Sequence, residues 1–150
     1  MGRTTPSLAL NTINMEALEQ KHVMVVVKNI LQQLAGTTAT SVFCSWGVSQ
    51  MYATQIVMPV NGMDFPMAAL VMEVNGFNFR GKLYVALDEG CDYYRIYCEK
   101  NGSLQEEHHD IGIEELGTVL DSLIETGGLS KEEYKKKVVV FIFFYLNLRE

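Results

Sequence analysis

Two Asn-Gly pairs, Asn75-Gly76 and Asn101-Gly102, each lie between segments in which apolar and polar residues alternate. Asn-Gly is the strongest short-range signal for a two-residue type I′ β-hairpin, because both central residues of that turn have a positive φ. A two-residue turn also determines which residues of the flanking strands lie opposite each other. The two pairs therefore predict an antiparallel meander over residues 67–110 with defined registers.

The predicted registers give the sheet one apolar face. The first turn pairs Met72 with Phe79, and the loop after the second strand pairs Leu83 with Ile96. Side chains alternate across a strand, so residues of equal parity share a face. The apolar set is Ala68, Leu70, Met72, Val74, Phe77, Phe79, Gly81, Leu83, Val85, Tyr94, Ile96 and Cys98. Phe79 is expected to be among the most buried of them.

The opposite face carries tyrosines interleaved with basic side chains. The turn at Asn101-Gly102 pairs Tyr97 with Glu106, and the registers place Lys82 opposite Tyr97 and Tyr84 opposite Arg95. We call the candidate partner-binding set the tyrosine-basic face: Arg80, Lys82, Tyr84, Tyr93, Arg95 and Tyr97. Such a face can stack bases or bind an acidic segment. A solvated sheet face with ordinary cross-strand pairs is the alternative.

Hydrophobic periodicity and the positions of glycine and proline predict the remaining elements. These are a helix over residues 14–35 that ends at Gly36, strands over residues 42–48 and 50–57, a loop over residues 58–66 with Pro59 and Pro66, and a helix over residues 112–126 that ends at Gly127-Gly128. Residues 1–13 read as a mobile arm. The fold class is α+β: residues 14–150 form a single domain, an antiparallel meander of about five or six strands flanked by an N-terminal helix and two C-terminal helices.

The last predicted helix has no polar side. Ser130 and Glu133 form a capping box that opens it. The run Val138–Leu146 is apolar around the whole circumference, and a final strand is the alternative there. This run is far shorter than the roughly 20 apolar residues that cross a bilayer, so we expect no membrane span. A homodimer would cover the run, with Phe141, Phe144, Tyr145 and Leu148 as candidate interface residues.

Composition limits the classes of function. The 150 residues are 48% hydrophobic and carry a formal net charge of −6, as expected of one globular domain. The negative charge argues against binding to nucleic-acid phosphates and leaves basic peptides as partners. Three cysteines without Cys-x-x-Cys spacing, and an N-terminus without an apolar signal-peptide core, predict a cytoplasmic protein.

Catalytic and metal-binding patterns are sparse. Residues 106–110, Glu-Glu-His-His-Asp, are the only cluster that could ligate a metal, but His108 and His109 point to opposite faces of a regular strand. The registers place no histidine beside Cys91 or Cys98, as a cysteine nucleophile requires. The sequence therefore predicts no catalytic residue, no metal and no cofactor.

Size, acidity and the order helix–antiparallel sheet–helix are similar to those of small bacterial secretion chaperones. That resemblance implies a homodimer that holds a disordered segment of a partner protein. The chain lacks the helix that these chaperones carry between their third and fourth strands. The first hypothesis is a non-enzymatic protein-interaction or regulatory module. The alternatives are a small-ligand-binding domain or enzyme with a cavity between helices and sheet, and a single-stranded nucleic-acid binder.

Overall fold

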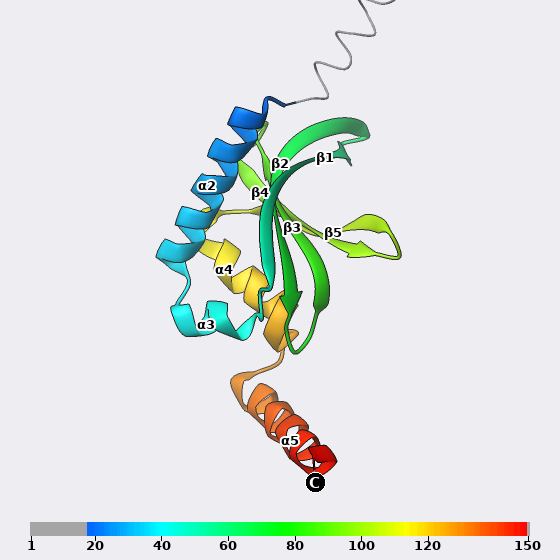
Figure 1. Ribbon diagram of the computed structural model, residues 1–150. Coiled ribbons are helices and arrows are strands. Elements are labelled where there is room, and N and C mark those ends of the chain that lie inside the picture. Colours follow the sequence, from blue (N-terminus) through cyan, green and yellow to red (C-terminus); the bar gives the residue numbers. More distant parts are fainter. Residues whose placement is uncertain (1–17, 150) are drawn as a thin grey trace, which may run out of the picture.

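The computed structural model describes residues 18–149 and contains one antiparallel sheet of five strands in the order β1-β2-β3-β4-β5 (Figure 1). The predicted α+β class, with an antiparallel meander, an N-terminal helix and C-terminal helices, is confirmed. The elements are α2 Gln20–Thr37, α3 Thr40–Ser45, β1 Gln50–Val60, β2 Met63–Asn75, β3 Arg80–Asp88, β4 Tyr93–Lys100, β5 Ser103–Ile111, α4 Ile113–Asp121, the π-helical turn η1 Ser122–Thr126, and α5 Lys131–Arg149.

The helices α2 and α4 cover one face of the sheet (Figure 1). The α2 stripe of Val27, Ile30 and Leu34 packs on sheet residues such as Leu70 and Leu83, which are fully buried. The predicted apolar face is therefore the covered one. Its continuity gives the protein a single main core between helices and sheet.

The first helix differs from its predicted bounds. It begins at Gln20, after Glu19 in an extended conformation, and it continues through Gly36 to Thr37. A Cβ atom at Gly36 would meet no other atom within 4 Å, so no close approach demands a glycine there. Extended backbone at Thr38 ends the helix instead. The predicted mobile arm over residues 1–13 lies outside the described residues.

The predicted strand over residues 42–48 is wrong, because Thr40–Ser45 is the short helix α3. Val42, Phe43 and Trp46 have helical as well as alternating spacing. Trp46 is fully buried, and Val42 and Phe43 pack against the same core. Core packing of these three side chains thus selects the helix.

The predicted loop over residues 58–66 is also wrong. The strands β1 and β2 continue through it and meet at a two-residue turn, Asn61-Gly62, where φ is 53° and 81°. Pro59 lies in the edge strand β1, where a missing N–H group is tolerated. This third Asn-Gly pair thus forms a two-residue hairpin turn at a place where a loop was predicted.

At Asn75-Gly76 the predicted two-residue turn does not form. Met72 lies opposite Leu83 rather than Phe79, and Phe79 is only partly buried. The reason is tertiary: the amides of Asn78 and Phe79 both donate to the Ile124 carbonyl at 2.9 Å, so a longer loop is docked on η1. The register moves by an even number of residues, which leaves the residues that stay in β2 and β3 on their predicted faces.

The two remaining registers differ less from the prediction. Leu83 lies opposite Cys98 instead of Ile96, again an even shift. The predicted pair Tyr97 and Glu106 is confirmed, next to a turn at Asn101-Gly102 with φ of 52° and 81°. Irregularities farther along β4 and β5 place His108 opposite Ile96 rather than Arg95. These bulges bend the end of β5.

The C-terminal helices form as predicted. The α4 helix and η1 cover residues 113–126, and Gly127 follows with a left-handed φ of 64°. Ser130 and Glu133 make both hydrogen bonds of a capping box, at 3.1 and 3.2 Å. The run Val138–Leu146 is helical, so the alternative of a final strand is wrong.

Candidate functional site

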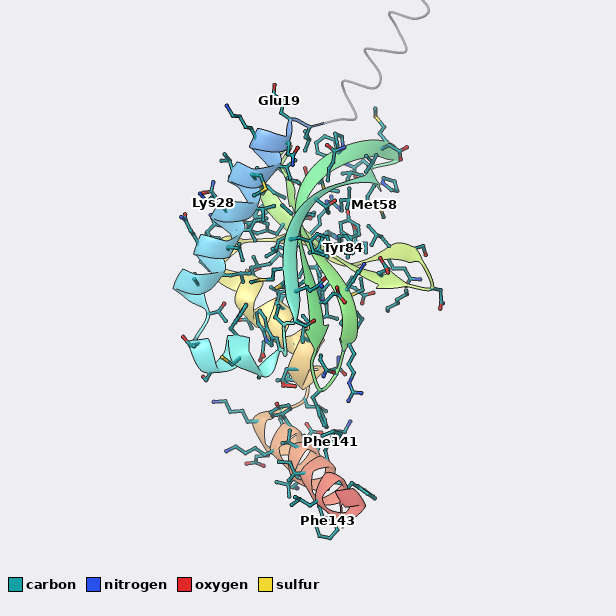
Figure 2. The ribbon with its side chains drawn as sticks, viewed as in Figure 1. Glu19, Lys28, Met58, Tyr84, Phe141 and Phe143 are labelled. Carbon is teal, nitrogen blue, oxygen red and sulfur yellow. The ribbon has the colours of Figure 1, made fainter. Side chains whose placement is uncertain are left out.

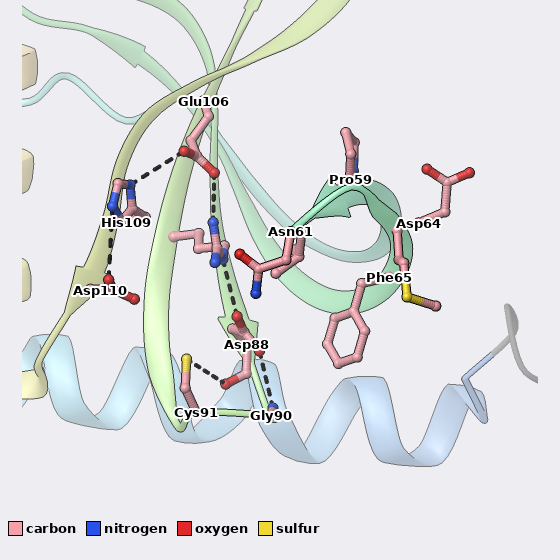
Figure 3. A pocket seen from close by; sticks show the side chains of 13 residues that line it. Pro59, Asn61, Asp64, Phe65, Asp88, Gly90, Cys91, Glu106, His109 and Asp110 are labelled. Atoms are coloured by element: carbon pink, nitrogen blue, oxygen red, sulfur yellow. Dashed lines mark hydrogen bonds and ion pairs between the residues drawn. The ribbon is translucent and has the colours of Figure 1, made fainter.

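The face of the sheet opposite α2 holds a groove of about 810 Å³, which we call the hairpin groove (Figure 3). The β1–β2 and β4–β5 hairpins both project on this side of the molecule (Figure 1). The turn of the β1–β2 hairpin forms one wall, with Phe65 among its residues. The other wall carries charged residues of β3, β4 and β5: Asp88, Arg95, Glu106, His109 and Asp110.

Arg95 organises the charged wall of the hairpin groove. Its Nε donates to Asp88 Oδ2 at 3.1 Å, and its Nη1 donates to Glu106 Oε1 at 2.7 Å. The second oxygen of Asp88, Oδ1, accepts the backbone amide of Gly90 at 3.0 Å. Asp88 is 4% exposed, so its charge is buried together with its partner. Figure 3 shows these groups in one chain of contacts.

Both members of this buried pair stay charged. Burial acts to raise the pKa of Asp88, but hydrogen bonds from Arg95, Cys91 and Gly90 outweigh it and hold that pKa below its ordinary value. Burial acts to lower the pKa of Arg95, and the contacts with Asp88 and Glu106 raise it overall. Arg95 is therefore neutralised within the protein and is not a free anion-binding group.

The remaining groups of the wall do not assemble a reactive centre. His109 lies 3.4 Å from Glu106 Oε2 and 3.8 Å from Asp110 Oδ2. Burial raises the pKa of the Cys91 thiol, so the thiolate form needed by a nucleophile is disfavoured. No group of three or more potential ligands among the described residues is placed to hold a metal ion. With more carboxylates than cations on its wall, the groove can accept hydrogen bonds from an ammonium or guanidinium group.

The tyrosine-basic face is not one exposed surface. Tyr97 is 1% exposed and packs with Ile56, Met67 and other residues of the β1–β2 hairpin. Burial, and next the charge of Glu106, raises the pKa of Tyr97 to about 12. Tyr84 is partly buried and donates to Glu99 at 3.2 Å. A buried tyrosine cannot stack a base, so Tyr97 is not available for binding on the tyrosine-basic face.

Lys82 and Tyr84 remain neighbours on β3, but the other members of the predicted set do not join them on one exposed face. Tyr84 lies opposite Tyr97 rather than Arg95. Arg95 belongs to the hairpin groove, Arg80 is exposed at the start of β3, and Tyr93 is 45% exposed at the start of β4. Sequence reasoning missed Asp88 and the hairpin turn as walls of the groove. The pair Asn61-Gly62, which marks the turn, was the available signal.

The second candidate surface is α5, which points away from the sheet and the other helices (Figure 1). The described side chains from Val139 to Phe144, and Leu146, are exposed, and Figure 2 shows Phe143 near the end of the helix. Exposed fractions run from 47% to 64% over the residues Val139, Val140, Phe141, Ile142, Phe143, Phe144 and Leu146. The predicted interface residues Phe141 and Phe144 are among them, whereas the side chains of Tyr145 and Leu148 lie outside the described residues.

The base of α5 contacts the β2–β3 loop and η1. The Phe77 ring makes edge contacts with Tyr134 at 6.1 Å and with Phe141 at 5.5 Å. Glu125 accepts the amide of Phe77 at 2.7 Å. Burial raises the pKa of Tyr134 to about 12, with further contributions from a hydrogen bond to Glu125 and from its charge. The rest of the helix has no aromatic contact with the domain in the described residues.

Comparison of the chain with protein-family models, curated proteins and solved structures finds no match. In the described part of the chain, no helix combines the length and hydrophobicity needed to span a bilayer. The fold and its surfaces therefore define a small α+β domain with a charged groove and an uncovered apolar helix.

Proposed function

We propose that this protein is a non-enzymatic protein-interaction module of the cytoplasm that acts as a homodimer. The observation that supports it is the uncovered apolar half of α5. Fully burying a large apolar side chain contributes roughly 1.5–3 kcal/mol, so a set of half-exposed ones favours association strongly. An exposed patch of this kind marks an interaction site on a soluble protein.

The hairpin groove offers a second surface, suited to a protein segment rather than to a reaction. Its one arginine is held in ion pairs with Asp88 and Glu106. The additional carboxylates on the wall favour a basic segment, in agreement with the net charge of −6. Holding a partner segment on a dimer is also what the resemblance to secretion chaperones implies.

Light scattering at tens of micromolar protein tests the proposal. The intact chain should have twice the monomer mass, and the Phe141→Asp/Phe144→Asp variant should have the monomer mass, because buried unpaired carboxylates oppose association. A Met51→Asp/Met63→Asp variant is the matched control, since these methionines are equally exposed on the sheet, at 44% and 74%. It should remain a dimer.

A folded intact chain that is monomeric under these conditions would contradict the proposal. Circular dichroism of each variant shows whether a change in mass reflects lost association or lost folding. If only the control variant became a monomer, the interface would lie on the sheet and not on α5.

A further inference from the structure

The apolar half of α5 needs more cover than a single helix can give. Two packed helices each bury one stripe and leave the opposite side in water. Val140 and Ile142 point to different sides of the helix, and both are about half exposed. A dimer that covers α5 must therefore supply a second contact besides the helix of the other copy.

The direction of packing decides whether that second contact exists. The 19 residues of α5 extend over about 28 Å, about the width of a small domain. In a parallel pair both apolar ends would point away from both domains. In each copy the domain begins at the base of α5 (Figure 1). In an antiparallel pair the end of each helix would reach the base of the other, and so the domain of the other copy.

Charge favours the same direction. Lys135, Lys136 and Lys137 lie directly before the apolar run, in the half of α5 nearest the domain. Parallel packing would bring the two lysine clusters together, and like charges at close range are destabilising. Antiparallel packing separates them by the length of the helices. It also places the positive end of each helix dipole beside the negative end of the other, which is favourable.

An apolar groove lies on the domain near the base of α5. It has a volume of about 330 Å³ and is lined by Leu31, Leu34, Ala35, Thr38, Thr40 and Phe43, from the end of α2 and from α3. The α3 helix borders the first turn of α5, because Ser41, Val42 and Tyr134 line a common smaller pocket. The groove is therefore within reach of a second helix that lies alongside α5.

We propose that the dimer is antiparallel and that the apolar half of each α5 occupies the α2–α3 groove of the second copy. This arrangement rests on the proposed homodimer and names the surface that completes it. One side of each α5 contacts the other α5, and the opposite side contacts the groove. Because a two-fold axis relates the two copies, each groove is occupied by the helix of the other copy. The assembly therefore contains two copies and does not extend further.

Cysteine cross-linking tests the arrangement, because Cys44 is exposed on α3 beside the groove. In a Cys91→Ser background, Phe143→Cys introduces a thiol on the exposed side of α5. A short bismaleimide should then give a covalent dimer in which position 143 is joined to Cys44, as peptide mass spectrometry will show. Cys44→Ser should abolish this product, and Met63→Cys, at the distant β1–β2 turn, should give no such product.

The possible outcomes distinguish a failure of the antiparallel arrangement from a failure of the proposed homodimer. A dimer by light scattering in which position 143 links only to position 143, with and without Cys44→Ser, overturns the arrangement. A dimer with no link to Cys44 overturns it as well, and so does a link within a single chain. A monomeric intact chain overturns the proposed homodimer, and the arrangement with it.

Discussion

The helices α2 and α5 are almost equal in length, at 18 and 19 residues, but their surroundings differ. Every third or fourth residue of α2 is buried, and Ile30 at its centre is fully buried on the sheet. At the centre of α5 the side chains from Val139 to Phe144 are all exposed, with Ile142 at 49%. A helix with one apolar stripe needs one surface to cover it, and α2 finds that surface on the sheet. A helix that is apolar around its whole circumference needs cover on every side, and the domain does not cover α5 in this way. The helix α2 thus completes the domain, and the same difference supports our proposal that α5 serves association.

The largest expected effect compares equal deletions in the two helices. Ile30→Ala should lower the free energy of unfolding by about 2–5 kcal/mol, because it leaves a cavity between α2 and the sheet. Ile142→Ala should change it by less than about 0.5 kcal/mol, because that side chain is half exposed within the chain. Urea denaturation in the Phe141→Asp/Phe144→Asp background keeps association out of the measurement. Equal losses would show that α5 is part of the folded core.

A second prediction concerns a buried charge in the domain that loses its partner. A charge on the exposed helix α5 would tolerate that loss, whereas the buried charge should not. Arg95→Met removes the partner of the buried Asp88 and should cost about 3 kcal/mol at pH 7. Lys100→Met is the control: it breaks the more exposed pair with Glu107, 3.2 Å long, and should cost at most about 1 kcal/mol. Similar losses in the free energy of unfolding for both variants would mean that Arg95 and Asp88 do not form the buried ion pair of the structure.

The same pair predicts a pH dependence. The pKa of Asp88 lies below its ordinary value of 3.8, so its contribution to stability is present above that pH and is lost as the pH falls through the lower, folded pKa. Without Arg95, the largest contribution that lowers this pKa is lost, so the pKa should rise. The stability difference between the intact chain and Arg95→Met should therefore shrink as the pH falls from 7 to below 3.8. Urea titrations at each pH measure it, and a constant difference would contradict it.

The smallest expected effect concerns the junction between α5 and the domain. The pKa of Tyr134 is raised from 10.0 to about 12, so its contribution to docking is present below pH 10 and is lost as the pH rises through 12. NMR resonances of the Tyr134 and Phe77 rings should change together over this interval. Resonances of Ile30 should not follow them. A Tyr134 phenol that titrates near 10 would show that the base of α5 is not docked.

The comparison also shows which predictions from sequence are dependable. Residue parity placed Leu70, Leu83 and Ile96 on the covered face even though the β2–β3 and β3–β4 registers differed, because both shifts were even. Asn101-Gly102 formed the predicted turn. Asn75-Gly76 did not, because its loop is held by Ile124, nearly 50 positions later in the chain. Local turn propensity is outweighed where a distant carbonyl accepts the hydrogen bonds of the loop.

The sequence by itself determined the fold class, the apolar face and the absence of a polar side on the last helix, since each follows from spacing along the chain. Only the tertiary structure decided which surfaces are open. Tyr97 is buried because the β1–β2 hairpin packs over it, and Asp88 meets Arg95 because two neighbouring strands place them together. Contacts between distant residues decide burial and pairing, and the spacing of residues within one element does not contain them.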